Sequence, residues 1–332
     1  MKITALLLLA LALMPKAGAL AADGVGSADR AQFGGRSYVR LGNWARANEF
    51  TLRWLERDKA LELDKPLARL VFSVDPRSDS RKAQINGVVV WLALPLVNHN
   101  GSAFISQTDL STTLAPVLSP PANPPGTRIK TICLDPGHGG KDPGYQIGSH
   151  DEKKYALLLA KEVRDQLTRA GFKVCMTRSS DTFPSLEART DLAQRRKADL
   201  FVSLHFNSAG AQHPEVKGVE VYALTPAGAF STNAGGEGDT RPCAGNRHDE
   251  RNMLLAYQMQ KSITKDLPIE DRGAKRARYQ VLREAGMPAI LIEGGFMSNP
   301  AEGQRIFDPV YRRRMARAVV DGILGYQQMI KG

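Results

Sequence analysis

The sequence predicts an α/β protein: a mostly parallel sheet flanked by helices forms the C-terminal part, and a small β-rich domain precedes it. Strand-like and helix-like segments alternate after residue 128, whereas short apolar runs separated by turn signals fill the region before residue 118. Between them, segment 119–127 reads SPPANPPGT, and its four prolines favour an extended spacer. We therefore expect an N-terminal domain at 23–118, a linker at 119–127 and a catalytic domain at 128–332.

The C-terminal region alternates strands and helices along its length. Strands are expected at 130–134, 172–177, 200–205, 219–224 and 289–293, and helices at 152–170, 186–197, 252–267 and 310–330. In the first helix, four apolar residues recur at every fourth position, and Gly171 ends it: Tyr155, Leu159, Val163 and Leu167. This alternation is typical of a parallel sheet that is covered on both faces.

The N-terminal region shows strand signals and one clear hairpin. Residues 69–74 and 88–94 have strand composition, and Asn86-Gly87 readily takes the positive φ values of a two-residue turn. A further strand is expected at 103–106 and a short helix at 109–118. The stretch 85–118 resembles the small N-terminal-like domain of copper amine oxidases, which implies a wall-targeting or packing role. It implies no copper site, because His99 is the only histidine of the segment.

Composition and charge narrow the class of protein. The chain of 332 residues is 42% hydrophobic and 24% charged, which excludes a disordered or multi-span membrane protein. Residues 1–22 begin with Lys2, continue as an apolar run at 4–14 and end in small residues, which predicts a cleaved signal peptide and no membrane span after cleavage. We expect an exported protein, periplasmic or associated with the cell wall.

The net charge of +11 suits an anionic partner. For an exported protein this favours the carboxylates of a cell wall, while a solvated surface without any partner stays open. A nucleic-acid binder would fit the charge but conflicts with the export signal and lacks a recognition motif.

Four polar residues lie at the carboxyl ends of predicted strands or at the start of the first helix, where α/β proteins place their functional residues. His138 follows the first strand in Asp135-Pro-Gly-His-Gly-Gly140, Glu152 opens the first helix, and His205 and Glu293 end later strands. Because the carboxyl ends of parallel strands meet at one edge, we expect these residues to lie together. Two histidines and a carboxylate form a catalytic zinc set, and a further carboxylate can transfer a proton. From spacing alone, structural roles also stay open: bracing a turn, favouring a helix start, or pairing with an arginine.

The C-terminal region closely resembles the amidase-3 family of N-acetylmuramoyl-L-alanine amidases, zinc enzymes that trim peptidoglycan. The matching segments occur in the family's order: 134–144 (LDPGHGGKDPG), Glu152-Lys153 with Leu157, Met176-Thr-Arg178 with Asp181, 203–208 (SLHFNS) and 287–300 (MPAILIEGGFMSNP). The resemblance implies zinc bound by His138, Glu152 and His205, and Glu293 as the catalytic acid/base. It implies hydrolysis of the amide between N-acetylmuramic acid and L-alanine of the stem peptide.

Two other functions stay open on the residues alone. The same metal chemistry fits a zinc peptidase that cuts within the stem peptide, and the basic surface fits a wall-binding protein without catalysis. The four intact site residues argue against the second. We expect a monomer, and the need for a protein activator stays open.

Several polar residues outside this set receive weaker interpretations. Arg241 and Arg247 of the glycine-rich loop 225–250, and Arg251 directly after it, are candidates to meet substrate carboxylates, and a plain surface insertion is the alternative for the loop. The others are His150 as a competing ligand, Asp135 and Asp142 as turn formers, Asn207 as a partner of His205 or substrate, Cys133 and Cys175 as core residues, and Cys243 as an exposed thiol.

Overall fold

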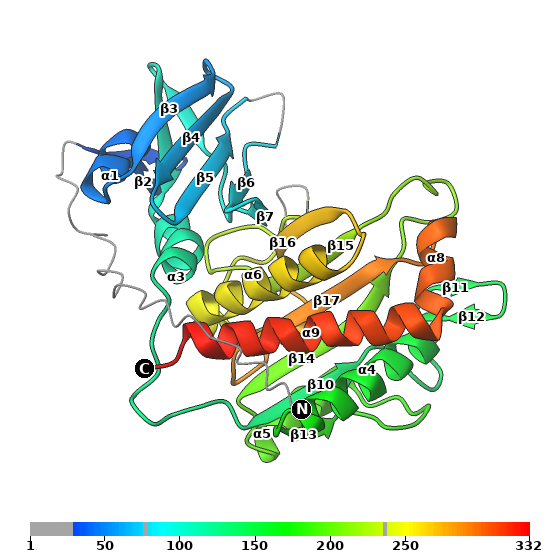
Figure 1. Ribbon diagram of the computed structural model, residues 1–332. Helices are drawn as coiled ribbons and strands as arrows, with labels where there is room; N and C mark the ends of the chain where they lie inside the picture. The colour runs from blue at the N-terminus through cyan, green and yellow to red at the C-terminus, as the bar shows by residue number, and fades with distance from the viewer. Residues whose placement is uncertain (1–28, 76–78, 235–237) are drawn as a thin grey trace, which may run out of the picture.

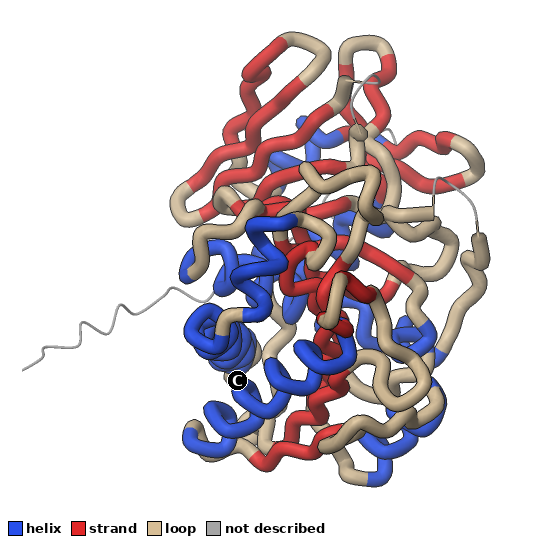
Figure 2. The backbone as a smooth tube through the Cα atoms, turned by 90° about the vertical axis from the view of Figure 1, so that its right-hand side faces the viewer, coloured by secondary structure: helices blue, strands red, loops and turns tan. Residues whose placement is uncertain are grey.

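The computed structural model describes residues 29–75, 79–234 and 238–332, and its centre is one eleven-stranded sheet (Figure 1). The predicted signal peptide at 1–22 lies outside the described residues. From one edge to the other the strands are β13 (Lys173–Met176), β10 (Thr131–Pro136), β14 (Leu200–Asn207), β17 (Ala289–Phe296), β15 (Val219–Leu224), β16 (Asp271–Ala277), β7 (Val88–Trp91), β6 (Lys82–Ile85), β5 (Ala68–Ser73), β4 (Ala60–Lys65) and β3 (Thr51–Glu56). Strands therefore run through the molecule from one end to the other (Figure 2).

The C-terminal half of this sheet is mostly parallel, as the alternating pattern predicts. β13, β10, β14 and β17 all run in the same direction. β15 runs antiparallel to β17. The short segment 208–218 joins the end of β14 directly to the start of β15, so β15 runs opposite to β14 and to β17, which is parallel to β14. β16 then pairs with β15 in parallel.

Helices cover both faces of this half. α4 (Glu152–Arg169), α6 (Asp249–Asp266) and α9 (Pro309–Met329) pack on one face, where α9 contacts both α4 and α6 (Figure 1). α5 (Leu186–Arg195) and α7 (Gln280–Arg283) pack on the other face, and α8 (Pro300–Phe307) contacts α9. The predicted apolar stripe of α4 is buried, and the chain turns at Gly171 with φ +91°.

The N-terminal region is β-rich, and it contains a second sheet besides its five strands of the large one. In sheet order, the strands of this second sheet are β1 (Arg30–Phe33), β2 (Arg36–Arg40), β9 (Ser102–Ser106) and β8 (Val97–His99), and α1 (Leu41–Ala47) packs against them. Asn86-Gly87 forms the expected turn between β6 and β7, with φ values of +50° and +81°. The helix expected at 109–118 consists of α2 (Gln107–Asp109), the π-helical turn η2 (Leu110–Leu114) and α3 (Ala115–Leu118).

Strand pairing joins the N-terminal region to the parallel half. β7 pairs with β16, with Val90 opposite Ala274, and both side chains are buried in the same hydrophobic core. The buried Arg276 guanidinium of β16 donates to the Thr113 hydroxyl of η2 at 2.7 Å. The proline-rich segment 119–127 therefore separates two stretches of sequence whose strands belong to one sheet.

Two short elements complete the fold. The hairpin of β11 (Gln146–Ile147) and β12 (His150–Asp151) precedes α4, and the 3-10 turn η3 (Ala244–His248) precedes α6. Within the described part of the chain, no helix combines the length and the apolar composition that a membrane span requires.

Candidate metal centre and catalytic carboxylate

Three strands of the parallel sheet bring predicted site residues together at their carboxyl ends. His138 follows β10, while His205 of β14 lies directly opposite Glu293 of β17. Glu152 is the first residue of α4, which starts at the same edge. The structure therefore brings all four residues into one region, because strand ends and a helix start converge there.

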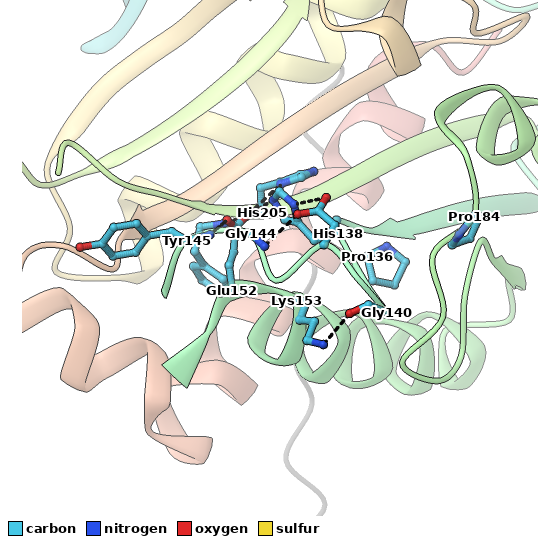
Figure 3. Close-up of polar contacts among 12 residues, drawn as sticks. Pro136, His138, Gly140, Gly144, Tyr145, Glu152, Lys153, Pro184 and His205 are labelled. Atoms are coloured by element: carbon cyan, nitrogen blue, oxygen red, sulfur yellow. Dashed lines mark hydrogen bonds and ion pairs between the residues drawn. The ribbon is translucent and has the colours of Figure 1, made fainter. Parts of the chain in front are cut away.

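His138, Glu152 and His205 form a compact cluster (Figure 3). Glu152 Oε1 lies 3.0 Å from His138 Nε2 and 2.9 Å from His205 Nδ1, and the two nitrogens are 3.2 Å apart. Ligand atoms placed tetrahedrally around zinc at about 2.0–2.1 Å stand about 3.3 Å from one another. The two imidazoles and the carboxylate therefore fit a zinc ion in both chemistry and spacing.

The glycine-rich loop after β10 brings its backbone unusually close to these ligands. His138 has φ +59°, a left-handed conformation that is uncommon for non-glycine residues. A Cβ on Gly137 would lie 2.1 Å from the His205 ring, and a Cβ on Gly144 would lie 2.6 Å from Glu152 Oε2. Glycine is therefore required at both positions for the ligands to come together.

Hydrogen bonds orient the ligands from behind. Asp142 Oδ2 lies 2.8 Å from His138 Nδ1, so Nδ1 can stay protonated when a metal replaces the hydrogen bond between Nε2 and Glu152. Glu152 Oε2 accepts a hydrogen bond from the Tyr145 N–H at 3.0 Å. Burial alone would raise the pKa of Glu152, but hydrogen bonds from His138 and His205 lower that pKa well below its usual range. Glu152 is therefore ionised, which is the form that can bind a metal ion.

Two buried arginines, whose role no sequence pattern predicted, hold the loop in place. Arg178 donates to the Gly137 carbonyl at 2.6 Å. Arg189 of α5 donates to the His138 carbonyl at 2.9 Å and forms an ion pair with Asp135 at 2.8 Å. An arginine that binds backbone carbonyls produces no recognisable spacing in the sequence. The only sequence signal is that Arg178 belongs to a segment that carries the family resemblance.

Glu293 lies beside the cluster, between His205 on β14 and Glu220 on β15. Its Oε2 is buried and has no hydrogen-bond partner among the described residues. Burial, followed by repulsion from Glu152 and Glu220, raises the pKa of Glu293 well above its usual value. An unpaired carboxyl group with a raised pKa beside a metal cluster is suited to general acid/base chemistry.

Comparison with known proteins shows which family the C-terminal part of the chain matches. Residues 132–325, more than half of the chain, match the family Amidase_3, described as N-acetylmuramoyl-L-alanine amidase. The chain belongs to this amidase family. The match begins at residue 132, so the copper amine oxidase resemblance of segment 85–118 stays a prediction.

Individual members of the amidase family are similar to this chain over its C-terminal part. N-acetylmuramoyl-L-alanine amidase AmiC of Neisseria meningitidis is 34% identical over 224 residues, which are 60% of this chain and 53% of the relative. A probable cell wall amidase, LytH of Staphylococcus epidermidis, is 33% identical over 200 residues, or 59% of this chain and 58% of the relative. The chain thus spans a little over half of the length of these relatives.

A solved structure supports the fold of the amidase region. The amidase AmiC2 of Nostoc punctiforme superposes with a TM-score of 0.50 at 33% identity, and it covers 60% of this chain and 97% of its own. The mostly parallel α/β architecture is therefore confirmed by a family member.

Beside Glu293, this amidase-family chain carries a charge cluster around the buried Glu220 that no sequence pattern predicted. Glu220 Oε1 lies 2.6 Å from both Arg272 Nε and Lys275 Nζ, and Oε2 accepts a hydrogen bond from the Asn207 amide at 2.9 Å. Burial alone would raise the pKa of Glu220, but the two cations lower it. The carboxylate of Glu220 therefore lies next to Glu293, and the Asn207 amide donates to this carboxylate rather than to His205.

Other residues singled out in the sequence lie outside the site. The His150 ring stacks on Phe307 with 3.8 Å between centroids, away from the metal cluster. Arg251 donates to Asn123 Oδ1 at 2.7 Å. It lies beside Leu200, the first residue of β14, and thus at the amino end of the strand whose carboxyl end carries His205. The interpretation of Arg251 as a substrate contact is therefore wrong.

The three cysteines are free thiols. Cys133 is buried in β10, as expected of a core residue, whereas Cys175, directly opposite it in β13, is only half-buried. Cys243, which we expected to be exposed, is half-buried, and its Sγ lies 3.2 Å from Asn246 Oδ1.

Proposed function

We propose that this chain hydrolyses the amide between the lactyl group of N-acetylmuramic acid and L-alanine of the peptidoglycan stem peptide. The observation that carries the proposal is the cluster of His138, Glu152 and His205 beside the buried Glu293, in a chain that belongs to the amidase family. The proposal includes export to the periplasm or cell wall, where the charge of +9 that remains once a signal peptide carrying Lys2 and Lys16 is removed favours binding to a carboxylate-rich polymer.

The cluster supports zinc as the resident metal. Two imidazole nitrogens and one carboxylate oxygen are the donors of many catalytic zinc sites, which keep a further position open. A zinc ion held there supplies a Lewis acid for the amide carbonyl and lowers the pKa of a bound water. Asp142 fixes the tautomer of His138, and backbone N–H groups hold Glu152, so the donors are oriented before any metal arrives.

Glu293 is proposed to move the proton that hydrolysis requires. As a carboxylate it accepts a proton from the attacking water, and as a carboxylic acid it donates that proton to the alanine nitrogen while the C–N bond breaks. Its place opposite His205 and its unpaired Oε2 support this role. The raised pKa favours the protonated form that the leaving nitrogen needs.

Digestion of purified cell wall, followed by mass analysis of the products with and without a chelator, tests the proposal. We expect chelator-sensitive release of intact stem peptides that begin with L-alanine, while the glycan strands remain intact. Shortened peptides still attached to muramic acid would instead identify a zinc peptidase. Wall binding without any product from the zinc-loaded protein would identify a binding protein and overturn the proposal.

A further inference from the structure

The sheet face that carries His205 and Glu293 continues onto the N-terminal region. Side chains of paired residues point to the same face, and the register places Glu293 opposite Glu220 on β15 and Tyr222 opposite Lys275 on β16. β7, from the N-terminal region, is the next strand along (Figure 1). Val90 lies opposite Ala274, so the next residue, Trp91, shares its face with Lys275.

Trp91 packs against the charge cluster of the amidase half. Its indole Nε1–H donates to the Arg272 carbonyl at 2.9 Å, and the Lys275 ammonium lies 5.2 Å from the ring centroid. A Cβ on Gly273 would lie 2.9 Å from Trp91 Cδ1, so this glycine makes room for the indole. Arg272 and Lys275 are therefore positioned from one side by Glu220 and from the other by a residue of the N-terminal region.

This cluster carries a surplus of positive charge and reaches solvent. Arg272 and Lys275 share the single carboxylate of Glu220, and their side chains are 30% and 12% exposed. Lys82 of β6 lies opposite Trp91, is exposed, and forms no ion pair within residues 29–75, 79–234 and 238–332. The Arg272 guanidinium also lies 5.1 Å from the ring of Phe296, at the end of the strand that carries Glu293.

We propose that Arg272 and Lys275, supported by Trp91, form a subsite for a carboxylate of the stem peptide, so that the N-terminal region builds part of the substrate site. The inference rests on the proposed function, because it takes the scissile amide to lie at Glu293. β17 and β16 are two strands apart, or about 10 Å. Three residues of extended peptide span about 10 Å, so the subsite meets a carboxylate two or three positions beyond the scissile alanine.

The test compares two soluble muramyl peptides that differ only at one stem-peptide group, a carboxylate or its amide. We measure kcat/KM on both for the zinc-loaded wild-type, Arg272→Gln and Lys275→Gln proteins. A hydrogen bond to a charged group is worth about tenfold or more in affinity, so the wild-type preference for the carboxylate should fall about tenfold in each variant, mainly through KM. Because Glu293 acts on both substrates, any change in its protonation cancels in this ratio.

Two further variants test whether the preference for the carboxylate depends on this subsite or on the net charge of the protein. Lys261→Gln removes one exposed positive charge from α6, on the other face of the sheet, and should keep the wild-type ratio. Lys82→Gln removes a charge of the N-terminal region and should lower the ratio about twofold at low salt but not at high salt. An equal loss in Lys261→Gln would mean that net charge matters rather than this subsite, and would overturn the proposal.

The remaining outcomes are also decisive. A wild-type protein without preference for the carboxylate, or an Arg272→Gln protein with the wild-type ratio, would overturn the subsite. If neither substrate is hydrolysed, the proposed function fails, and calorimetric binding of the same two peptides decides on the subsite separately. Far-ultraviolet circular dichroism verifies folding, and Lys275→Gln decides the question if Arg272→Gln does not fold.

Discussion

Glu293 is held where its negative charge is disfavoured. Its Oε2 is buried and without a hydrogen-bond partner in the described residues, and both Glu152 and Glu220 repel its charge. Between the usual carboxyl pKa and the raised one, the folded state binds a proton that the unfolded state does not. The contribution of Glu293 to stability therefore falls as the pH rises through this window, which is a cost of keeping a reactive carboxyl group in the site.

The variant Glu293→Gln should retain zinc but lose about 10²–10⁴-fold in turnover, the usual contribution of a general acid or base. In the metal-free form it should also melt at a higher temperature than the wild type above neutral pH, because the amide has no proton to lose. Zinc content, wall hydrolysis and thermal unfolding check these outcomes. Turnover at the wild-type rate would remove Glu293 from its proposed role.

The charge of Glu220 should control the pH dependence of hydrolysis. Glu220 raises the pKa of Glu293, so Glu220→Gln should lower that pKa and move the acidic limb of the pH–rate profile to lower pH. Glu62→Gln is a matched control, because Glu62 is equally buried between two arginines, Arg53 and Arg69, but lies on β4 in the N-terminal region. An acidic limb that stays in place in Glu220→Gln would contradict the assigned coupling.

The loop between β10 and α4 takes its shape from elements that lie far away in sequence. Arg178 follows β13 and Arg189 belongs to α5, yet both donate to backbone carbonyls of the loop that carries His138. This explains how a non-glycine residue is kept at φ +59°. The metal cluster thus depends on packing between elements as well as on its own three side chains.

Replacing Arg189 by methionine should destabilise the metal-free protein by about 3 kcal/mol, because Asp135 is left as a buried charge without its cation. The loss should stay near this value since Thr177 and Ser203 still donate to Asp135. Urea unfolding measures it, and Arg195→Met, at an exposed position of the same helix, should change stability by no more than about 0.5 kcal/mol. Equal effects of the two substitutions would show that the ion pair does not hold the loop.

Element prediction from the sequence succeeds where apolar residues recur regularly and fails where charge is buried. The strand expected at 219–224 is β15 (Val219–Leu224), and the helix expected at 152–170 is α4 (Glu152–Arg169). β16 was missed because four of its seven residues are charged, and their partners lie elsewhere in the chain. Motif spacing likewise predicts which strand ends carry Glu293 and the metal cluster, but it cannot show that Glu220 and Arg189 reach the same region.

The pairing of β7 with β16 makes one sheet of two regions that the sequence divides. No local pattern reveals this, because the pairing depends on residues more than 180 positions apart, such as Val89, whose N–H donates to Asp271 of β16. A shared core and a shared sheet mean that neither region keeps its packing when the other unfolds. The molecule should therefore behave as one cooperative unit.

All three tryptophans lie in the N-terminal region, whereas the long helices lie in the parallel half. Tryptophan fluorescence and far-ultraviolet circular dichroism therefore report on different parts of the molecule. In urea, both signals should change in one coincident transition. A fluorescence transition at lower urea than the dichroism transition would show that the N-terminal region unfolds by itself.

The central claim is that three side chains hold a zinc ion while Glu293 acts beside it, and a zinc titration tests this most directly. Zinc is added stepwise to metal-free wild-type and Glu293→Gln proteins, and bound zinc and wall hydrolysis are measured on the same samples. We predict that both proteins bind one zinc per chain and that hydrolysis rises in parallel only in the wild type. Hydrolysis by the metal-free protein, or failure of the wild type to bind zinc, would contradict the account.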